Sequence, residues 1–221
     1  MASYREHLMF SSVLGCGYAG FGSLCLNMDW GTSFLAAGLG TVGGLLPDLD
    51  SNSGKPIREL FGLAAAVLPF LLFETFKQRY PDAEDLEKPL VMAGAAYVGV
   101  RYGLSRIFKR ITVHRGMFHS IPAILIAGLI AFLLYRTPLL PRRLFVAGSV
   151  ALGFFSHLVL DEIYSVDFMG GKIRLNKYAG SALKFWSKSL PATLVCYGIL
   201  CGLLYLVWVQ VQPEILQLLG R

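Results

Sequence analysis

The sequence predicts an all-α membrane protein, a bundle of about seven transmembrane helices with a metal site at one membrane boundary. Of its 221 residues, 55% are hydrophobic and only 15% are charged, whereas soluble domains carry about 25% charged residues. Apolar runs long enough to cross a bilayer as helices recur along the chain. All four histidines and several aspartates lie near the ends of these runs.

Seven apolar segments are the candidate spans. A helix needs roughly 17 to 25 residues to cross a hydrocarbon core of about 30 Å. The second and fifth segments are short enough to end inside a protein-lined cavity. The first segment is predicted to be an anchor and not a cleaved signal peptide, because no clear cleavage site follows it. The segments cover residues 8–28, 32–47, 57–76, 89–107, 119–135, 143–164 and 190–211.

The connections between the spans indicate a single domain over residues 1–221. No linker rich in Pro, Ser or Gly divides the chain, and no repeat of fixed period is visible. Residues 78–88 are predicted to be a surface loop. Residues 165–189 form a longer loop, and its basic, aromatic second half resembles an interfacial amphipathic helix. There Lys184 and Lys188 favour binding to anionic lipid headgroups, with nucleic-acid binding as a weaker alternative.

The distribution of positive charge predicts the orientation in the membrane. When the seven spans alternate in direction, the loops on the side of the N-terminus carry 12 Lys and Arg residues and those on the other side carry 7. Cytoplasmic loops are enriched in Lys and Arg. We therefore expect a multi-pass protein of the inner (cytoplasmic) membrane with its N-terminal side in the cytoplasm.

The candidate metal ligands share one location, because each lies where a predicted span meets the cytoplasmic side. Ionisable residues at membrane depth are costly unless they have a partner. A divalent cation is a suitable partner, and imidazole with carboxylate favours zinc, manganese or iron. We predict one to three ions, with zinc as the first choice. The candidate ligands are His7, Asp48, Asp50, His114, His119, His157 and Asp161.

Two motifs have spacings that suit a shared ion. In SHLVLDE, His157 and Asp161 are four residues apart and therefore lie on one helix face. In PDLD, Asp48 and Asp50 follow a helix stop and can chelate one ion or two adjacent ions. Each motif has a simpler alternative. The first pair can be a buried hydrogen bond, and the two aspartates can be part of a helix-ending turn.

The HRGMFHS motif, residues 114–120, joins candidate ligands to a candidate anion-binding group. His114 and His119 straddle the start of the fifth predicted helix, where Ser120 is the expected N-cap. Arg115 lies between them and can hold a phosphate by charge-assisted hydrogen bonds. It can equally be an ordinary positive-inside anchor. The other basic candidates for substrate binding are Lys55 and Arg58.

These blocks resemble the YdjM-like family of bacterial inner-membrane proteins, which are described as metal-dependent hydrolases. The blocks are His7, LLPDLDS, HRGMFHS and HLVLDEIYS, in order across residues 7–165. The family is similar in turn to zinc-dependent phospholipases C and single-strand-specific nucleases, an analogy that implies a phosphoester substrate. Those enzymes use a processed N-terminal tryptophan as a ligand, whereas this chain begins MASYREH. His7 can take that place or one metal can be missing, so one or two ions are the safer expectation.

Motifs and resemblance together predict a hydrolase in which metal-activated water attacks an ester, with a phosphoester of a membrane lipid or lipid-linked molecule as the first candidate. Ligands at a membrane boundary face lipid headgroups, which makes anionic phospholipid a candidate substrate. Arg115 would stabilise developing negative charge. Glu162 lies about 100° around the helix from Asp161 and is a candidate general base.

Two alternatives to this hydrolase stay open. A metal-ion or small-molecule transporter would line a path with ionisable residues at several depths. A non-catalytic scaffold would hold a structural metal in closed coordination.

Overall fold

The computed structural model describes most of the chain in two compact units. The first unit comprises Met1–Pro47 with Arg115–Arg221, and the second comprises Asp48–His114. The single-domain interpretation therefore stays a prediction. The described residues are 3–50, 61–62, 65, 87–104, 117, 119–169, 172–175, 183–187 and 189–218.

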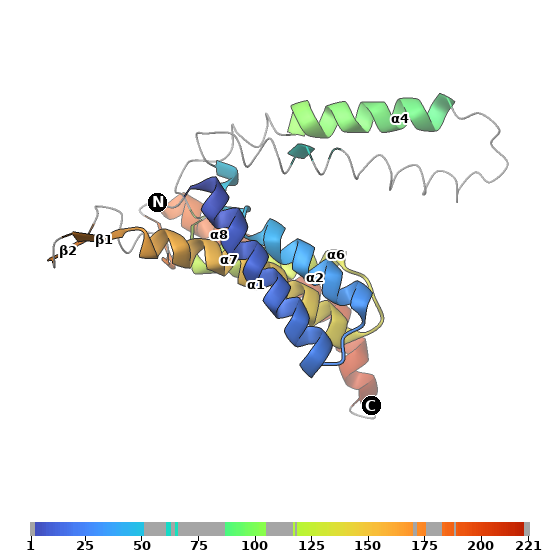
Figure 1. The fold of residues 1–221 in the computed structure, drawn as a ribbon. Helices are drawn as coiled ribbons and strands as arrows, with labels where there is room; N and C mark the ends of the chain where they lie inside the picture. Colours follow the sequence, from blue (N-terminus) through green and yellow to red (C-terminus); the bar gives the residue numbers. More distant parts are fainter. Residues whose placement is uncertain are drawn as a thin grey trace. The chain divides into compact units, whose positions relative to one another are not determined.

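The described helices of the first unit lie side by side (Figure 1). In this unit α1 packs against α2 and α7, α2 also packs against α7, and α6 packs against α7 and α8. The second unit contains α4 (Glu87–Val98), which continues into the π-helix η2 (Gly99–Leu104). The helices of the first unit are α1 (Tyr4–Cys25), α2 (Trp30–Gly43), α6 (Ile121–Leu134), α7 (Leu140–Ile163) and α8 (Leu190–Leu218).

The first unit has two ends, which we call proximal and distal. At the proximal end α1, α6 and α8 begin and α2 and α7 finish, and the Tyr164 hydroxyl donates a 2.7 Å hydrogen bond to Glu6 there. At the distal end α2 and α7 begin, and Arg142 Nε lies 3.1 Å from Asp29 Oδ2. Within the first unit α1 and α2 therefore run in opposite directions, and so do α6 and α7 and then α7 and α8, as the sequence predicts for successive spans.

Side-chain caps fix where three of these helices begin. Ser3 and Glu6 form a capping box at the start of α1. Asp29 caps α2 by accepting a 3.0 Å hydrogen bond from the Thr32 N–H. This bond and one from the Thr32 hydroxyl hold the pKa of the Asp29 carboxyl below its usual value. Ser120 caps α6 through the N–H of Ala123, which confirms the predicted N-cap.

Glycines let α2 and α7 approach at backbone distance. A Cβ on Gly153 would lie 1.9 Å from the carbonyl oxygen of Gly40, and a Cβ on Gly43 would lie 2.5 Å from that of Val150. Neither position has room for a side chain, as is typical of membrane helices that pack through small residues. Gly153 is one helical turn before His157. The contact therefore fixes the end of α2 beside this histidine.

Three described helices, α1, α7 and the first 24 residues of α8, are long and apolar enough to cross a membrane. The helices α2 and α6 have 14 residues each, about 21 Å at 1.5 Å per residue, and they match the two short segments predicted from the sequence. Of the predicted segment 57–76, only residues 61, 62 and 65 are described. The total of seven spans stays a prediction.

The predicted loop 165–189 has more structure than expected in its first half. Val166–Met169 (β1) and Lys172–Leu175 (β2) form an antiparallel hairpin with Val166 opposite Leu175. The regular elements of the described residues are therefore helices and this hairpin.

The amphipathic helix predicted for the second half of that loop is wrong for its described residues, 183–187 and 189, which are not helical. The carbonyl of Lys184 accepts a 2.9 Å hydrogen bond from the N–H of Ile121. Ile121 begins α6, and the first N–H groups of a helix lack partners inside it. The Lys184 carbonyl gives one of these N–H groups its hydrogen-bond partner. In a helix through this segment, the same carbonyl would instead accept from an N–H four residues later in its own helix.

Candidate metal centre

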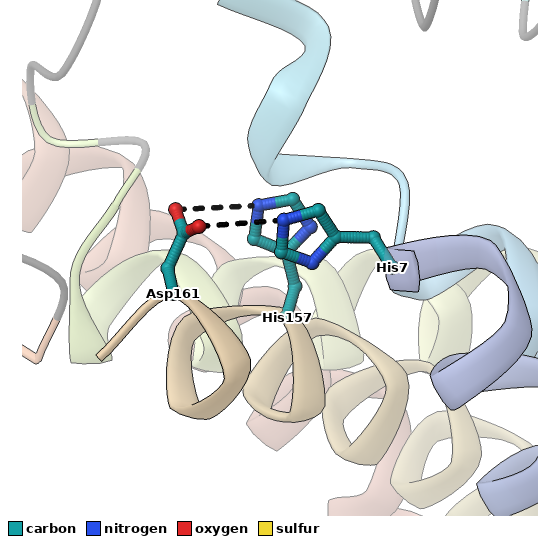
Figure 2. A group of neighbouring side chains, drawn as sticks. All are labelled: His7, His157 and Asp161. Atoms are coloured by element: carbon teal, nitrogen blue, oxygen red, sulfur yellow. Dashed lines mark ion pairs between the residues drawn. The ribbon is translucent and has the colours of Figure 1, made fainter. Parts of the chain in front are cut away.

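Four ionisable side chains from three parts of the first unit meet at its proximal end. His7 comes from the first turn of α1, His119 directly precedes the Ser120 cap of α6, and His157 and Asp161 lie one turn apart near the end of α7. None of the four residues is more than 6% exposed. Figure 2 shows His7, His157 and Asp161, with both imidazoles directed at the carboxylate.

The distances around Asp161 suit ligands that share an ion. Its Oδ1 lies 3.3 Å from His7 Nε2, and its Oδ2 lies 3.8 Å from His119 Nε2 and 3.9 Å from His157 Nε2. Hydrogen bonds from nitrogen to oxygen usually measure about 2.7–3.2 Å. Two donors bound to zinc at about 2.1 Å in a tetrahedral arrangement lie about 3.4 Å apart. The separations from His119 and His157 are too long for direct hydrogen bonds, and all three separations are compatible with ligands around one ion.

The imidazole rings are ordered against one another. The rings of His7 and His157 are stacked, with centroids 3.6 Å apart and planes inclined by 9°. The ring of His119 meets that of His157 edge-on, at a centroid distance of 5.7 Å. Stacking places the Nε2 atoms of His7 and His157 side by side, facing Asp161 (Figure 2).

The backbone of α2 orients the central histidine. His157 Nδ1 lies 2.7 Å from the carbonyl oxygen of Gly44, the residue that ends α2. A carbonyl can only accept, so Nδ1 carries the proton and Nε2 keeps its lone pair. This arrangement is typical of metal-binding histidines, whose second nitrogen donates to a carbonyl or carboxylate.

The residues present fit a divalent ion. One nitrogen each from His7 and His157 and one oxygen from Asp161 lie within 4.8 Å of one another. The other ring nitrogen of His7, Nδ1, is buried and has no hydrogen-bond partner among the described residues. Nitrogen and oxygen donors of this kind suit zinc, manganese and iron. The group can therefore hold a metal ion, as the sequence predicts.

Hydrogen bonds within α1 and from the end of α7 hold the first turn of α1, which carries His7. Glu6 closes the capping box with Ser3 and accepts the hydrogen bond from Tyr164 at the end of α7. That hydrogen bond raises the pKa of the Tyr164 hydroxyl. The carbonyl of His7 accepts a 2.8 Å hydrogen bond from Ser11. The bond from Tyr164 ties Glu6, the residue before His7, to the end of the helix that carries His157 and Asp161.

The family model of the YdjM inner membrane protein matches residues 1–171. The chain belongs to the YdjM inner membrane protein family. No curated protein and no solved structure matches it. The matched range contains every candidate ligand and ends before α8. Membership of this family, together with the three long apolar helices, indicates a membrane protein.

Among the ligands predicted for this YdjM family chain, the structure brings together His7, His119, His157 and Asp161. Asp48 lies in the 3-10 helix η1 (Pro47–Asp50), at the start of the second unit. The backbone of Asp50 ends η1, and its side chain is outside the described part. Glu162 is half-buried on α7. The predicted residues that lie outside the described ones are Lys55, Arg58, His114 and Arg115.

Sequence reasoning missed two supporting groups. The Gly44 carbonyl carries no sequence signal, because a backbone acceptor can belong to any residue type. The bond between Glu6 and Tyr164 joins residues 158 positions apart, so no local pattern reveals it. The capping box was detectable, because Ser3 and Glu6 have the S-x-x-E spacing that marks a helix start.

Proposed function

We propose that this YdjM family protein is a membrane-embedded, metal-dependent hydrolase whose substrate is an ester, with a phosphoester of a membrane lipid or lipid-linked molecule as the first candidate. The observation that carries the proposal is the arrangement of three imidazoles around Asp161, with nitrogen–oxygen distances of 3.3–3.9 Å. The family resemblance to metal-dependent hydrolases supports the reaction type.

His7, His119, His157 and Asp161 would hold the ion. A bound divalent ion supplies Lewis acidity and lowers the pKa of water towards 7. Zinc is the first choice, with manganese and iron as alternatives. Asp48, Asp50 and His114 stay predicted as further ligands, which would allow more than one ion.

The remaining residues have proposed roles that follow from their chemistry. The Gly44 carbonyl holds the His157 ring, and the buried surroundings exclude bulk water from the cluster. Arg115 would bind and stabilise negative charge on a phosphate, with Lys55 and Arg58 as further anion-binding candidates. Glu162 would act as general base next to Asp161.

A lipid substrate is supported by where the ligands lie along the helices. They occupy the first turn of α1, the residue before the α6 cap and the last two turns of α7. Helix ends in a membrane protein lie close to the headgroup region. A phosphoester bond in a lipid lies at this same level.

The proposal is tested with purified protein loaded with zinc. Metal content is measured by elemental analysis, and hydrolysis is measured on phospholipid vesicles and on a soluble phosphoester. We expect His157→Ala and Asp161→Ala to lose bound metal and hydrolysis together. Asp29→Asn is the matched control, because Asp29 is a carboxylate at the distal end, and it should retain both. Full turnover by either alanine variant would rule out the assignment.

The burial of the cluster favours a second candidate, a structural metal in a non-catalytic membrane scaffold. Structural sites have closed coordination, whereas catalytic sites keep one position open for water. Cobalt-substituted protein distinguishes the two, since azide or phosphate changes the visible spectrum only where an open position exists. An unchanged spectrum, with full metal content and no hydrolysis of any ester, would favour the scaffold.

A further inference from the structure

The segment Leu183–Ser187 is fixed in place by its backbone while its aromatic side chains face outward. The Lys184 carbonyl accepts from Ile121 at the start of α6, and the Phe185 carbonyl accepts a 3.1 Å hydrogen bond from the Tyr197 hydroxyl on α8. Phe185 and Trp186 are nevertheless exposed, Trp186 by 72%. These rings therefore contribute little to the described core, although the backbone that carries them is held on two sides.

The other tryptophans of the chain suggest what covers these rings. Trp30, at the distal start of α2, and Trp208, on α8, are also exposed. Trp208 follows Leu190, the first residue of α8, by 18 positions, about 27 Å along the helix, against a hydrocarbon core of about 30 Å. Tryptophans are enriched at both membrane–water interfaces. Leu190, four residues after Trp186, and Trp208 are therefore about as far apart as the two interfaces.

We propose that Leu183–Ser187 is an interfacial anchor that inserts Phe185 and Trp186 among the lipid headgroups at the proximal end. Lys184 lies between Leu183 and Phe185 in the sequence, and its positive charge suits anionic lipid headgroups at the membrane surface. The occupant of this surface is the bilayer itself, because the segment leads directly into α8, whose first 24 residues are long and apolar enough to span it.

The anchor also sets the depth of the metal centre. Lys184 forms a bridge with Ser120, the neighbour of His119, and Thr193 in the first turn of α8 contacts Met117. The start of α6 therefore links the metal cluster to the segment that we place among the headgroups. If the proposed hydrolysis is correct, a lipid phosphoester reaches the ligands without leaving the bilayer. This last step alone rests on the proposed function.

Fluorescence quenching in vesicles tests the anchor without metal or turnover. The double variant Trp30→Phe/Trp208→Phe retains Trp186 as its single tryptophan. It is reconstituted into phosphatidylcholine and phosphatidylglycerol vesicles that carry bromine either near the headgroup or near the bilayer centre. Bromine near the headgroup should quench Trp186 at least about twice as strongly as deep bromine, as expected for a tryptophan in an interfacial belt.

The matched control places a tryptophan in the middle of α8. Ile199→Trp, in a background with all three native tryptophans replaced by phenylalanine, lies about 14 Å from the start of α8, and we expect the reverse order of quenching. Circular dichroism verifies the helical content of both variants. Trp186 quenched by iodide in the water and by neither lipid would overturn the anchor, and so would stronger quenching by deep bromine.

Discussion

At the residue scale, the tertiary structure changes the interpretation of His7 from an ordinary interfacial residue to a candidate metal ligand. A lone histidine at a membrane boundary is usually an ordinary interfacial residue, and the sequence gives His7 no partner at helical spacing. In the structure it has the shortest of the three distances from a histidine nitrogen to Asp161, and it stacks on His157. Its importance arises from α1 packing against α7.

Replacing His7 should weaken metal binding more than stability alone explains. We expect His7→Ala to reduce zinc affinity by at least about tenfold, because even groups that only orient ligands cost 10–100-fold when removed. Equilibrium dialysis measures the change. Ser12→Ala is the matched control on α1, since the Ser12 hydroxyl donates within its own helix to the Leu8 carbonyl, away from the cluster. Unchanged affinity in His7→Ala would remove His7 from the ligand set.

At the element scale, the contact of α2 with α7 links packing to the site. The backbones meet at Gly40 and Gly153, and one turn further His157 donates to the Gly44 carbonyl. The helix that carries two of the ligands is therefore positioned by a helix that contributes a carbonyl and no described ligand side chain. A change in their separation should affect both stability and metal binding.

A methyl group at this contact should separate the two helices. We expect Gly153→Ala to lower the free energy of unfolding by about 1–3 kcal/mol, the usual cost of overpacking, and to weaken zinc binding as the His157 contact with Gly44 opens. Unfolding in detergent micelles followed by circular dichroism measures the first effect. Gly17→Ala makes the same change on α1, where a Cβ meets nothing within 4 Å, and it should leave both properties intact. Equal behaviour of the two variants would contradict the packing argument.

At the scale of the whole molecule, the cluster joins segments that are distant in the chain. His7, His119 and Asp161 belong to α1, the start of α6 and α7. An ion shared among them connects these three segments in the folded state only. Metal binding is therefore expected to stabilise the first unit as a whole.

Thermal unfolding with zinc and with chelator should differ accordingly. A ligand that binds only the folded state at a free concentration of 100 times its Kd adds about 2.7 kcal/mol. We expect EDTA to lower the unfolding temperature of the wild-type protein measured in micelles. The unfolding temperature of Asp161→Asn should be the same with zinc as with EDTA. An equally stable wild-type protein with zinc and with EDTA would show that no ion is held by the folded unit.

Several features of the fold and site could be predicted from local sequence. Apolar runs placed the described helices, the Ser120 cap followed from its residue type, and the i, i+4 spacing put His157 and Asp161 on one face of α7. The alternation of spans also placed His7, His119 and His157 at one end. The segment Leu183–Ser187 was mispredicted as helical, because its pattern of charges and aromatic rings does not reveal that the Lys184 carbonyl accepts from the Ile121 N–H at the start of α6.

By itself the sequence determined that this is a membrane protein of helices whose ionisable residues gather at span ends, because hydrophobic length and residue chemistry are local properties. Only the tertiary structure decided that His7 faces Asp161, that the Gly44 carbonyl holds His157, and that Lys184 pairs with the start of α6. These contacts depend on which helices pack together and on how each is rotated about its axis. Both are set by close approach at positions such as Gly153, where backbone meets backbone.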